Sequence, residues 1–344
     1  MTIRSLRLSL AALAGLLVLT GCPDKKTTET ADTSTSAAAP KLPRAPVFNA
    51  DSAYAFTARQ VAYGPRVPNS KAHVATGDWL VRKLKGYGLK VMEQPFQAMT
   101  FDGTNIRARN IIAQYQPQAA RRVAIFGHWD TRPFADNDPD PKKRKLPMDG
   151  ASDGASAVAV ALEMARVLSQ QPDSLAPNVG VDFIFFDAED WGFDSSTQQG
   201  QKNLLEGSGD SWCLGSQYWA AHLLPAGYKA EYGVLLDMVG AKNGKFTREK
   251  ISREKARSAV DKIWNTASQL GYTDFFIFQD TDEILDDHVY ANQAGVPTLD
   301  IYDHSFSGSI FPAYHHATAD NMSIIDRKTM KAVGQTMLQT LYVD

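Results

Sequence analysis

Residues 181–191 read V-D-F-I-F-F-D-A-E-D-W, an apolar run that ends abruptly in acidic residues. The short apolar run at 183–186 is typical of a strand buried inside an α/β sheet. Open α/β sheets hold their ligands beyond the carboxyl ends of the strands, which is where Glu189 and Asp190 fall. Two adjacent carboxylates are unfavourable there without a compensating cation. The stretch therefore predicts a cation site at the end of a buried strand.

Apolar runs and helical periodicities alternate along the rest of the chain. The apolar runs predict strands at 89–100, 108–115, 122–127, 232–238, 275–278 and 296–301. The periodicities predict helices at 51–62, 73–87, 156–168, 212–224, 254–270, 287–294 and 324–341. This order predicts one α/β domain over residues 46–344, with a mostly parallel sheet that is covered on both faces.

The composition excludes some classes of protein. Of 344 residues, 44% are apolar and 22% are charged, and the net charge is −2, which is ordinary for a globular protein. That charge does not point to a nucleic-acid partner or to an anionic membrane surface. The basic cluster Lys-Lys-Arg-Lys at 142–145 is interpreted as a solvated loop, because no aromatic residues are interleaved with it.

The first 45 residues predict export rather than a folded element. Arg4 and Arg7 precede an apolar segment at 8–19 that is short for a transmembrane helix, and L-T-G-C at 19–22 resembles a bacterial lipobox. We therefore expect a signal peptide at 1–21, then a lipidated Cys22 and a flexible linker at 22–45. The protein would then be a periplasm-facing lipoprotein, anchored to either membrane of a bacterial cell envelope. An uncleaved apolar N-terminus is the alternative.

The two cysteines cannot form an intramolecular disulfide if Cys22 is acylated. Cys213 is then interpreted as a small, buried apolar residue. A catalytic thiol is the alternative, although the sequence around it contains no partner motif.

Histidines and carboxylates gather at the predicted strand ends and in the loops that follow them. They are His128, Asp153, Glu189, Asp190, Asp237, Asp286, Asp287, His288, His315 and His316. Mixed imidazole and carboxylate ligands suit zinc better than magnesium, which prefers oxygen. The small residues around Asp153, G-A-S-D-G-A, would let the backbone approach such a site closely, and they lack a phosphate-loop motif. His73, by contrast, is expected as a surface or helix-face histidine.

The order of these motifs resembles that of a known group. H-x-D, G-A-S-D-G-A before a helix, F-F-D-A-E-D, L-L-D-M-V-G-A, D-D-H and H-x-T-x-D-N follow one another as in the M28 zinc aminopeptidase superfamily. From about residue 64 onward the chain looks closest to the animal-type (type II) glutaminyl cyclases, including their bacterial, lipoprotein-like members. The resemblance implies a three-layer α/β/α sandwich with a mixed, mostly parallel central sheet.

Carried over residue by residue, the resemblance implies a zinc site. The three zinc ligands match Asp153, Asp190 and His316. Glu189 matches the general acid/base. His128 and Asp237 match positions that hold a second zinc in the aminopeptidases and that are polar neighbours of the single zinc in the cyclases.

Three positions show where the chain follows or departs from the cyclase pattern. Asp286 stands before a second Asp and a His, as in the cyclases, where the first acid joins the acid/base network; the aminopeptidase pattern has a small residue there. Asp190 stands where animal cyclases carry Glu, and zinc accepts either carboxylate. His315 stands where cyclases usually carry Trp, so His315 is an alternative ligand to His316, although the spacing to the following T-x-D-N favours His316.

The resemblance therefore implies a zinc-dependent glutaminyl-peptide cyclotransferase, which converts the N-terminal Gln of peptides and proteins to pyroglutamate and releases ammonia. Glu189 would move the proton, with its pKa raised by Asp237 and Asp286. Candidate substrate-binding residues are Trp129, Trp191, Trp212 and His288, although core packing explains each tryptophan equally well. One zinc per chain and a monomer are expected. The alternatives are a di-zinc aminopeptidase that hydrolyses N-terminal residues, and a non-catalytic lipoprotein that binds zinc or peptides.

Overall fold

The computed structural model describes residues 45–171, 178–198 and 210–343, which all belong to one compact unit. The predicted signal peptide, Cys22 and the linker up to residue 44 lie outside the described residues. In the described part of the chain, no helix has the length and apolar character that spanning a membrane requires.

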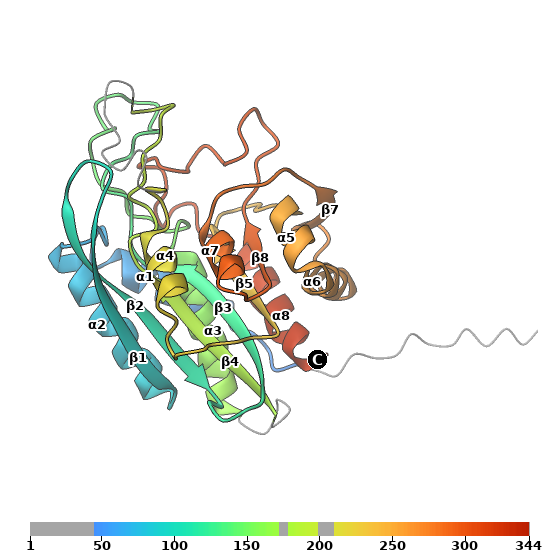
Figure 1. Ribbon diagram of the computed structural model, residues 1–344. Helices are drawn as coiled ribbons and strands as arrows, with labels where there is room; N and C mark the ends of the chain where they lie inside the picture. The colour runs from blue at the N-terminus through green and yellow to red at the C-terminus, as the bar shows by residue number, and fades with distance from the viewer. Residues whose placement is uncertain (1–44, 172–177, 199–209, 344) are drawn as a thin grey trace, which may run out of the picture. The chain divides into compact units, whose positions relative to one another are not determined.

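A six-stranded mixed sheet forms the centre of this unit (Figure 1). Its strands, in spatial order, are β1 (Lys90–Met99), β2 (Asn105–Tyr115), β4 (Val179–Phe186), β3 (Arg121–His128), β5 (Tyr232–Asp237) and β8 (Thr298–Tyr302). The last four in this order are parallel, and the antiparallel hairpin β1–β2 pairs with the other side of β4. The parallel strands therefore place their carboxyl ends at one edge of the sheet, where such folds hold their ligands.

Helices cover both faces of the sheet and form two cores with it. One core contains residues of α1 (Ala50–Val61), α2 (Lys71–Gly86), α3 (Ala155–Gln170), α6 (Arg257–Gln269) and α8 (Arg327–Tyr342). The opposite core contains residues of α4 (Leu214–Ala221) and α7 (Asp287–Gln293). This arrangement confirms the predicted three-layer α/β/α sandwich.

Strand β4 shows how one stretch of sequence contributes to both cores. All eight of its residues are buried, as its apolar run predicts. Because successive side chains of a strand face opposite sides of the sheet, Phe185 joins the core of α3, and Phe186 packs with Trp219 of α4. The one charged residue of the strand, Asp182, accepts a hydrogen bond of 2.6 Å from Arg122. Its burial is therefore compensated within the fold.

Three predicted elements differ from the structure. The helix predicted at 254–270 is divided into α5 (Lys250–Lys255) and α6, because Ala256 between them has a non-helical backbone with φ −131° and ψ 35°. The strand predicted at 275–278 is β7 (Phe276–Asp280), which does not join the central sheet. It pairs with β6 (Phe246–Arg248), a three-residue strand that is too short to show a periodicity. The helix predicted at 212–224 is the shorter α4, since Cys213 before it is left-handed.

Candidate active site

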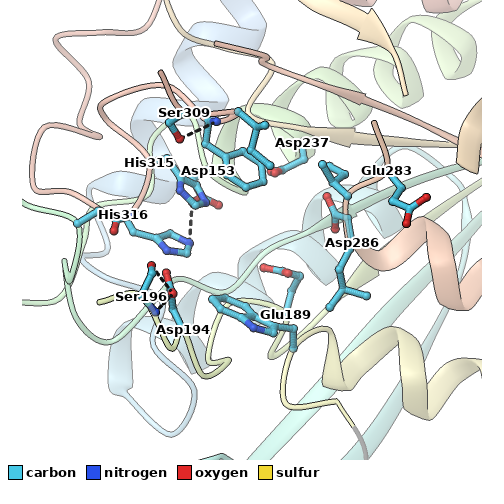
Figure 2. A pocket seen from close by; sticks show the side chains of 16 residues that line it. Asp153, Glu189, Asp194, Ser196, Asp237, Glu283, Asp286, Ser309, His315 and His316 are labelled. Carbon is cyan, nitrogen blue, oxygen red and sulfur yellow. Dashed lines mark hydrogen bonds and ion pairs between the residues drawn. The ribbon is translucent and has the colours of Figure 1, made fainter. Parts of the chain in front are cut away.

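The carboxyl ends of three parallel strands meet the starts of two helices at one cavity of about 490 Å³ (Figure 2). His128 ends β3, Asp237 ends β5, and Glu189 follows β4. Asp153 lies just before α3, and Asp286 caps the N-terminus of α7. Of the residues predicted for the site, those that line the cavity are Asp153, Glu189, Trp212, Asp237, Asp286, His315 and His316.

The structure brings together the three residues predicted as zinc ligands. The Nε2 atom of His316 lies 3.0 Å from Asp190 Oδ1 and 4.0 Å from Asp153 Oδ2. Nevertheless Asp190 Oδ1 is buried and has no hydrogen-bond partner among the described residues. Burial, and next the charge of Arg132, lower the pKa of His316 to about 3, so that its imidazole is neutral, as a metal ligand must be. Two carboxylates and a neutral imidazole form a donor set that fits a zinc ion, and a zinc ion would give Asp190 Oδ1 the partner that it lacks among the described residues.

A second group of metal-ligand type adjoins the first and shares Asp153 with it. His128 Nε2 lies 2.9 Å from Asp153 Oδ1 and 3.3 Å from Asp237 Oδ1. Burial alone would lower the pKa of His128, but the carboxylates of Asp130, Asp153 and Asp237 raise it well above its usual value. Gly154 permits the His128 ring to lie this close to the backbone, because a Cβ at this position would stand 2.8 Å from the ring.

Two fully buried carboxylates hold the backbone of the candidate ligands. Asp130 accepts hydrogen bonds from the amides of Glu189 and Asp190, at 3.1 and 3.2 Å. Asp320 likewise accepts from the amides of Ser152 and Asp153, at 2.7 and 3.0 Å. Each acid fixes two consecutive residues where a strand or loop turns into the site. The sequence motifs contain both acids but gave no sign of this role, since bonds to backbone amides leave no pattern in side-chain types.

A buried arginine compensates the acidic end of β4, and the sequence reasoning missed it. The backbone amide of Arg132 donates to Asp190 Oδ2 at 2.9 Å, and its guanidinium donates to the Asp190 carbonyl at 3.1 Å. The same guanidinium makes a paired contact with Asp136, at 2.8 and 2.7 Å. Arg132 stands two residues after the H-x-D motif in sequence, which is the only signal that could have located it.

Three carboxylates beside the candidate ligands hold protons unusually tightly. Burial, and then the charges of Asp190 and Asp286, raise the pKa of Glu189 well above its usual value, against the opposing charge of His128. Burial, followed by the charge of Asp237, raises the pKa of Asp286 to about 7. Burial also raises the pKa of Asp237 to about 6. Such a group can accept and return a proton near neutral pH.

Cys213 is buried and its thiol donates to Glu189 Oε1 at 3.4 Å. Burial and the nearby carboxylates raise the pKa of the thiol well above its usual value. A protonated, buried thiol is a poor nucleophile, so the structure favours the structural role over the catalytic one for this residue.

Aromatic rings stack in a column along one wall of the cavity. His315 stacks between Phe311 and His316, with ring centroids 4.3 and 3.6 Å away. Trp212 lies on the other side of His316 at 5.7 Å, and the Arg132 guanidinium covers Trp212 at 4.7 Å. His316 therefore sits inside the column with its Nε2 atom toward Asp190. A ring nitrogen of His315 also lies within 4.8 Å of ligand atoms of Asp153 and His316, so His315 remains an alternative ligand.

Backbone strain gathers around the same cavity. Ala188, Cys213, Met238 and His316 all have φ between 51° and 58°, a left-handed conformation that is unfavourable for residues with a side chain. They adjoin or include Glu189, Asp237 and the candidate metal histidine. Strain of this kind clusters at functional sites, where the surrounding fold enforces it.

Three of the predicted substrate-binding residues do not line the cavity. Trp129 is fully buried and stacks on His73 at 4.3 Å. Trp191 is 8% exposed, and its indole N–H points to Asp102. His288 is fully buried, 3.4 Å from Glu249 and 3.8 Å from Asp300. Only Trp212 of the four lines the described cavity.

His73 lies on helix α2, as one of its two expected placements has it, but the expectation of a surface histidine is wrong. This histidine is 3% exposed, and its Nε2 atom lies 2.8 and 2.9 Å from the two carboxylate oxygens of Asp187. Asp187 also accepts from the amide of Arg109 at 2.7 Å. The pair fixes the turn that leads from β4 to Glu189. The helical periodicity around His73 could not reveal it, because the partner is 114 residues away in sequence.

Comparison with known proteins assigns the chain to a family. The model of peptidase family M28 matches residues 110–341. A glutaminyl-peptide cyclotransferase of Gloydius blomhoffii is 27% identical over 300 residues, which cover 79% of this chain and 75% of that protein. The solved glutaminyl cyclase of Bacteroides thetaiotaomicron, bound to N-acetylhistamine, is 45% identical with a TM-score of 0.81 and covers 88% of this chain and 100% of its own.

A further solved relative carries a different description. The Zn-dependent exopeptidase of Parabacteroides distasonis is 46% identical with a TM-score of 0.82, covering 88% of this chain and 100% of its own. These relatives and the donor set at His316 identify zinc as the metal of the site. The motifs, the fold and the matched residues agree, and the chain belongs to peptidase family M28.

Proposed function

We propose that the protein is a zinc-dependent glutaminyl-peptide cyclotransferase, which converts N-terminal glutamine to pyroglutamate and releases ammonia. The observation that carries the proposal is the group of Glu189, Asp237 and Asp286 in the cavity beside the candidate zinc ligands, of which Asp286 is buried and the other two side chains are 14% exposed. Oxygens of Glu189 and Asp286 lie within 4.8 Å of each other, and both pKa values are raised. The high identity to a solved glutaminyl cyclase supports the same activity.

The reaction needs no nucleophile from the protein. The α-amine of the peptide attacks the γ-carbonyl carbon of its own glutamine, and the bond from that carbon to the amide nitrogen breaks. Proximity within one residue favours this ring closure. Zinc held by Asp153, Asp190 and His316 would supply polarisation of the γ-carbonyl. Glu189 takes the proton that the amine loses and gives it to the departing ammonia, so that atoms and charge balance.

Burial and the surrounding acids raise the pKa of Glu189, which suits it both to accept and to donate a proton. A carboxylate that both accepts and donates a proton needs a pKa near the working pH. Burial and the neighbouring carboxylates raise the pKa of Glu189, and the thiol of Cys213 fixes its Oε1 atom. Asp286, whose pKa rises to about 7, has an oxygen within 4.8 Å of Glu189 and can take part in holding that proton. Besides burial, the charge of Asp237, whose own pKa rises to about 6, helps to raise the pKa of Asp286.

A di-zinc aminopeptidase is the second candidate, and one observation favours it. Asp153 faces His128 with one oxygen and His316 with the other, so the two groups of metal-ligand type share it and each could hold a zinc ion. Glu189 would then activate a water for hydrolysis of the N-terminal peptide bond. One zinc per chain agrees with the cyclase and two with the peptidase, so metal analysis of purified protein separates the two candidates.

The direct test is incubation with a peptide that begins with Gln, followed by mass spectrometry. The cyclase converts the peptide to a product that has lost one ammonia and keeps all its residues. Release of free glutamine with a shortened peptide would refute the proposal in favour of the peptidase. The variant Glu189→Gln is the control for both activities.

We also propose that the protein is a monomeric lipoprotein, anchored through Cys22 and facing the periplasm. The support is the charged, apolar and L-T-G-C pattern of residues 1–22. Replacement of Cys22 by alanine should move the protein from the membrane fraction to the soluble fraction of the envelope. Retention of that variant in the membrane would contradict the anchor, and sedimentation of the soluble variant tests the monomer.

A further inference from the structure

The basic segment 142–145, Lys-Lys-Arg-Lys, has no part in the proposed reaction, yet the fold fixes it beside the candidate active site. All four of its residues are exposed. The Nε atom of Arg144 donates to the carbonyl of Asp138 at 2.8 Å, which holds the segment to the preceding turn. In the same loop, the amide of Asn137 donates to the carbonyl of His316 at 2.9 Å. The segment is therefore tied, through its own loop, to the candidate metal histidine.

A second cavity connects the active-site cavity with this segment. It has a volume of about 330 Å³, and Asn137 and Ser196 line both cavities. Arg144 lines the second one. The one carboxylate among its described lining residues, Asp136, is already paired with the guanidinium of Arg132 at 2.8 and 2.7 Å. A chain that leaves the active-site cavity past Asn137 and Ser196 therefore meets the positive charge of Arg144.

The two cavities differ in charge. The described lining of the active-site cavity contains no Lys or Arg and six carboxylates, namely Asp153, Glu189, Asp194, Asp237, Glu283 and Asp286. By contrast, no side chain of the basic segment forms an ion pair with a carboxylate of the described residues. Complementary charges attract across an interface, so the active-site cavity favours a cationic group such as a peptide amine, and the basic segment favours an anion.

We infer that the basic segment and the adjoining cavity form an exosite, outside the active-site cavity, for Asp or Glu residues of the substrate that lie beyond the residue next to its N-terminal glutamine. The inference rests on the proposed function and deepens it by naming the substrate class. With the glutamine in the active-site cavity, the following residues run outward past Asn137 and Ser196, and their carboxylates come to face the basic segment. An acid directly after the glutamine would instead meet the carboxylates of the active-site cavity. The enzyme therefore selects substrates by the position of their acidic residues.

The test compares ammonia release from four peptides by the zinc-loaded enzyme. The reference is the amide of Gln-Ser-Gly-Ser-Gly-Ser-Gly, and in the others Asp-Asp replaces the second and third, the fourth and fifth, or the sixth and seventh residues. Two exposed ion pairs should raise kcat/KM about two- to thirtyfold for at least one of the two peptides with the more distant acids, mainly through KM. The acids next to the glutamine should give no gain. In 1 M sodium chloride the gain should largely vanish, because the Debye length falls to about 3 Å.

A charge-reversal variant tests the segment itself. Lys142→Glu/Lys143→Glu/Lys145→Glu keeps Arg144, which holds the loop, and changes the segment from four positive charges to one positive and three negative. The ratio of the preferred acidic peptide to the neutral one should then fall below one. The matched control is Lys71→Glu/Lys85→Glu/Lys90→Glu, which makes the same change of net charge at exposed lysines that line neither cavity. This control should keep the wild-type ratio.

The outcomes separate the exosite from the proposed function. Equal rates for all four peptides, a gain only from acids next to the glutamine, or an unchanged ratio in the charge-reversal variant would overturn the exosite. So would the absence of any preference among the peptides together with binding of the wild type, and not of this variant, to phosphatidylglycerol vesicles, since the segment would then bind an anionic membrane surface. Failure of all four peptides to release ammonia would instead refute the proposed function.

Discussion

Replacing His315 by phenylalanine or by alanine distinguishes a ring that supports the zinc ligand from one that is itself a ligand. The ring centroids of His315 and His316 are 3.6 Å apart with planes inclined by 25°. His316, and not His315, lies 3.0 Å from Asp190. We therefore expect His315→Phe to keep the stack and bind zinc nearly as well as the wild type, although phenylalanine offers no ligand atom.

The magnitudes follow from the loss of one contact. A stacked aromatic pair contributes about 0.5–1.5 kcal/mol, so His315→Ala should weaken zinc binding by about two- to twelvefold. His316→Phe removes a ligand outright and should weaken it by more than the roughly 10–100-fold that loss of a supporting partner produces. Competition with a chromophoric chelator measures these affinities without any turnover, and circular dichroism confirms that the variants are folded. If His315→Phe loses as much affinity as His316→Phe, His315 is a ligand and the assignment is refuted.

Three further predictions concern the carboxylates. Glu189→Gln should lower kcat by about 10²–10⁴-fold while zinc binding persists, and substantial residual turnover would exclude Glu189 as the proton carrier. The charge of Asp286 helps to raise the pKa of Glu189, and a base acts only when deprotonated, so Asp286→Asn should move the acidic limb of the kcat/KM profile to lower pH; a shift to higher pH would contradict this coupling. His73→Leu leaves Asp187 buried without its partner and should lower the free energy of unfolding by about 3–5 kcal/mol in urea titrations, whereas a loss under about 1 kcal/mol would show that the pair is not important for stability.

Local patterns predicted most elements of the fold. Strand β4 was predictable because burial on both faces requires apolar residues at nearly every position, and α3 because its apolar side chains recur with helical spacing. The break at Ala256 was not predictable, since the periodicity continues through it. The pairing of β6 with β7 was not predictable either, because a three-residue strand is defined by its neighbour rather than by its own sequence.

In the candidate site, too, local motifs were predictable and contacts between distant residues were not. Motifs at strand ends pointed to Asp153, Glu189, Asp237 and Asp286 because parallel strands bring their carboxyl ends together. Hydrogen bonds between residues far apart in sequence could not be predicted. Arg132 and Asp190 are 58 residues apart, so neither reveals the other in sequence. The tryptophans show a further limit, since composition alone cannot separate a wall of the cavity, such as Trp212, from a core residue.

The central claim is that this M28 protein cyclises N-terminal glutamine rather than hydrolysing peptides. One zinc-loaded preparation should be given an equimolar mixture of two peptides that differ only in beginning with Gln or Leu, and both products should be followed by mass spectrometry. The account predicts that the Gln peptide loses ammonia and keeps its length while the Leu peptide stays intact. Release of free leucine or glutamine, with no ammonia lost from an intact chain, would contradict it.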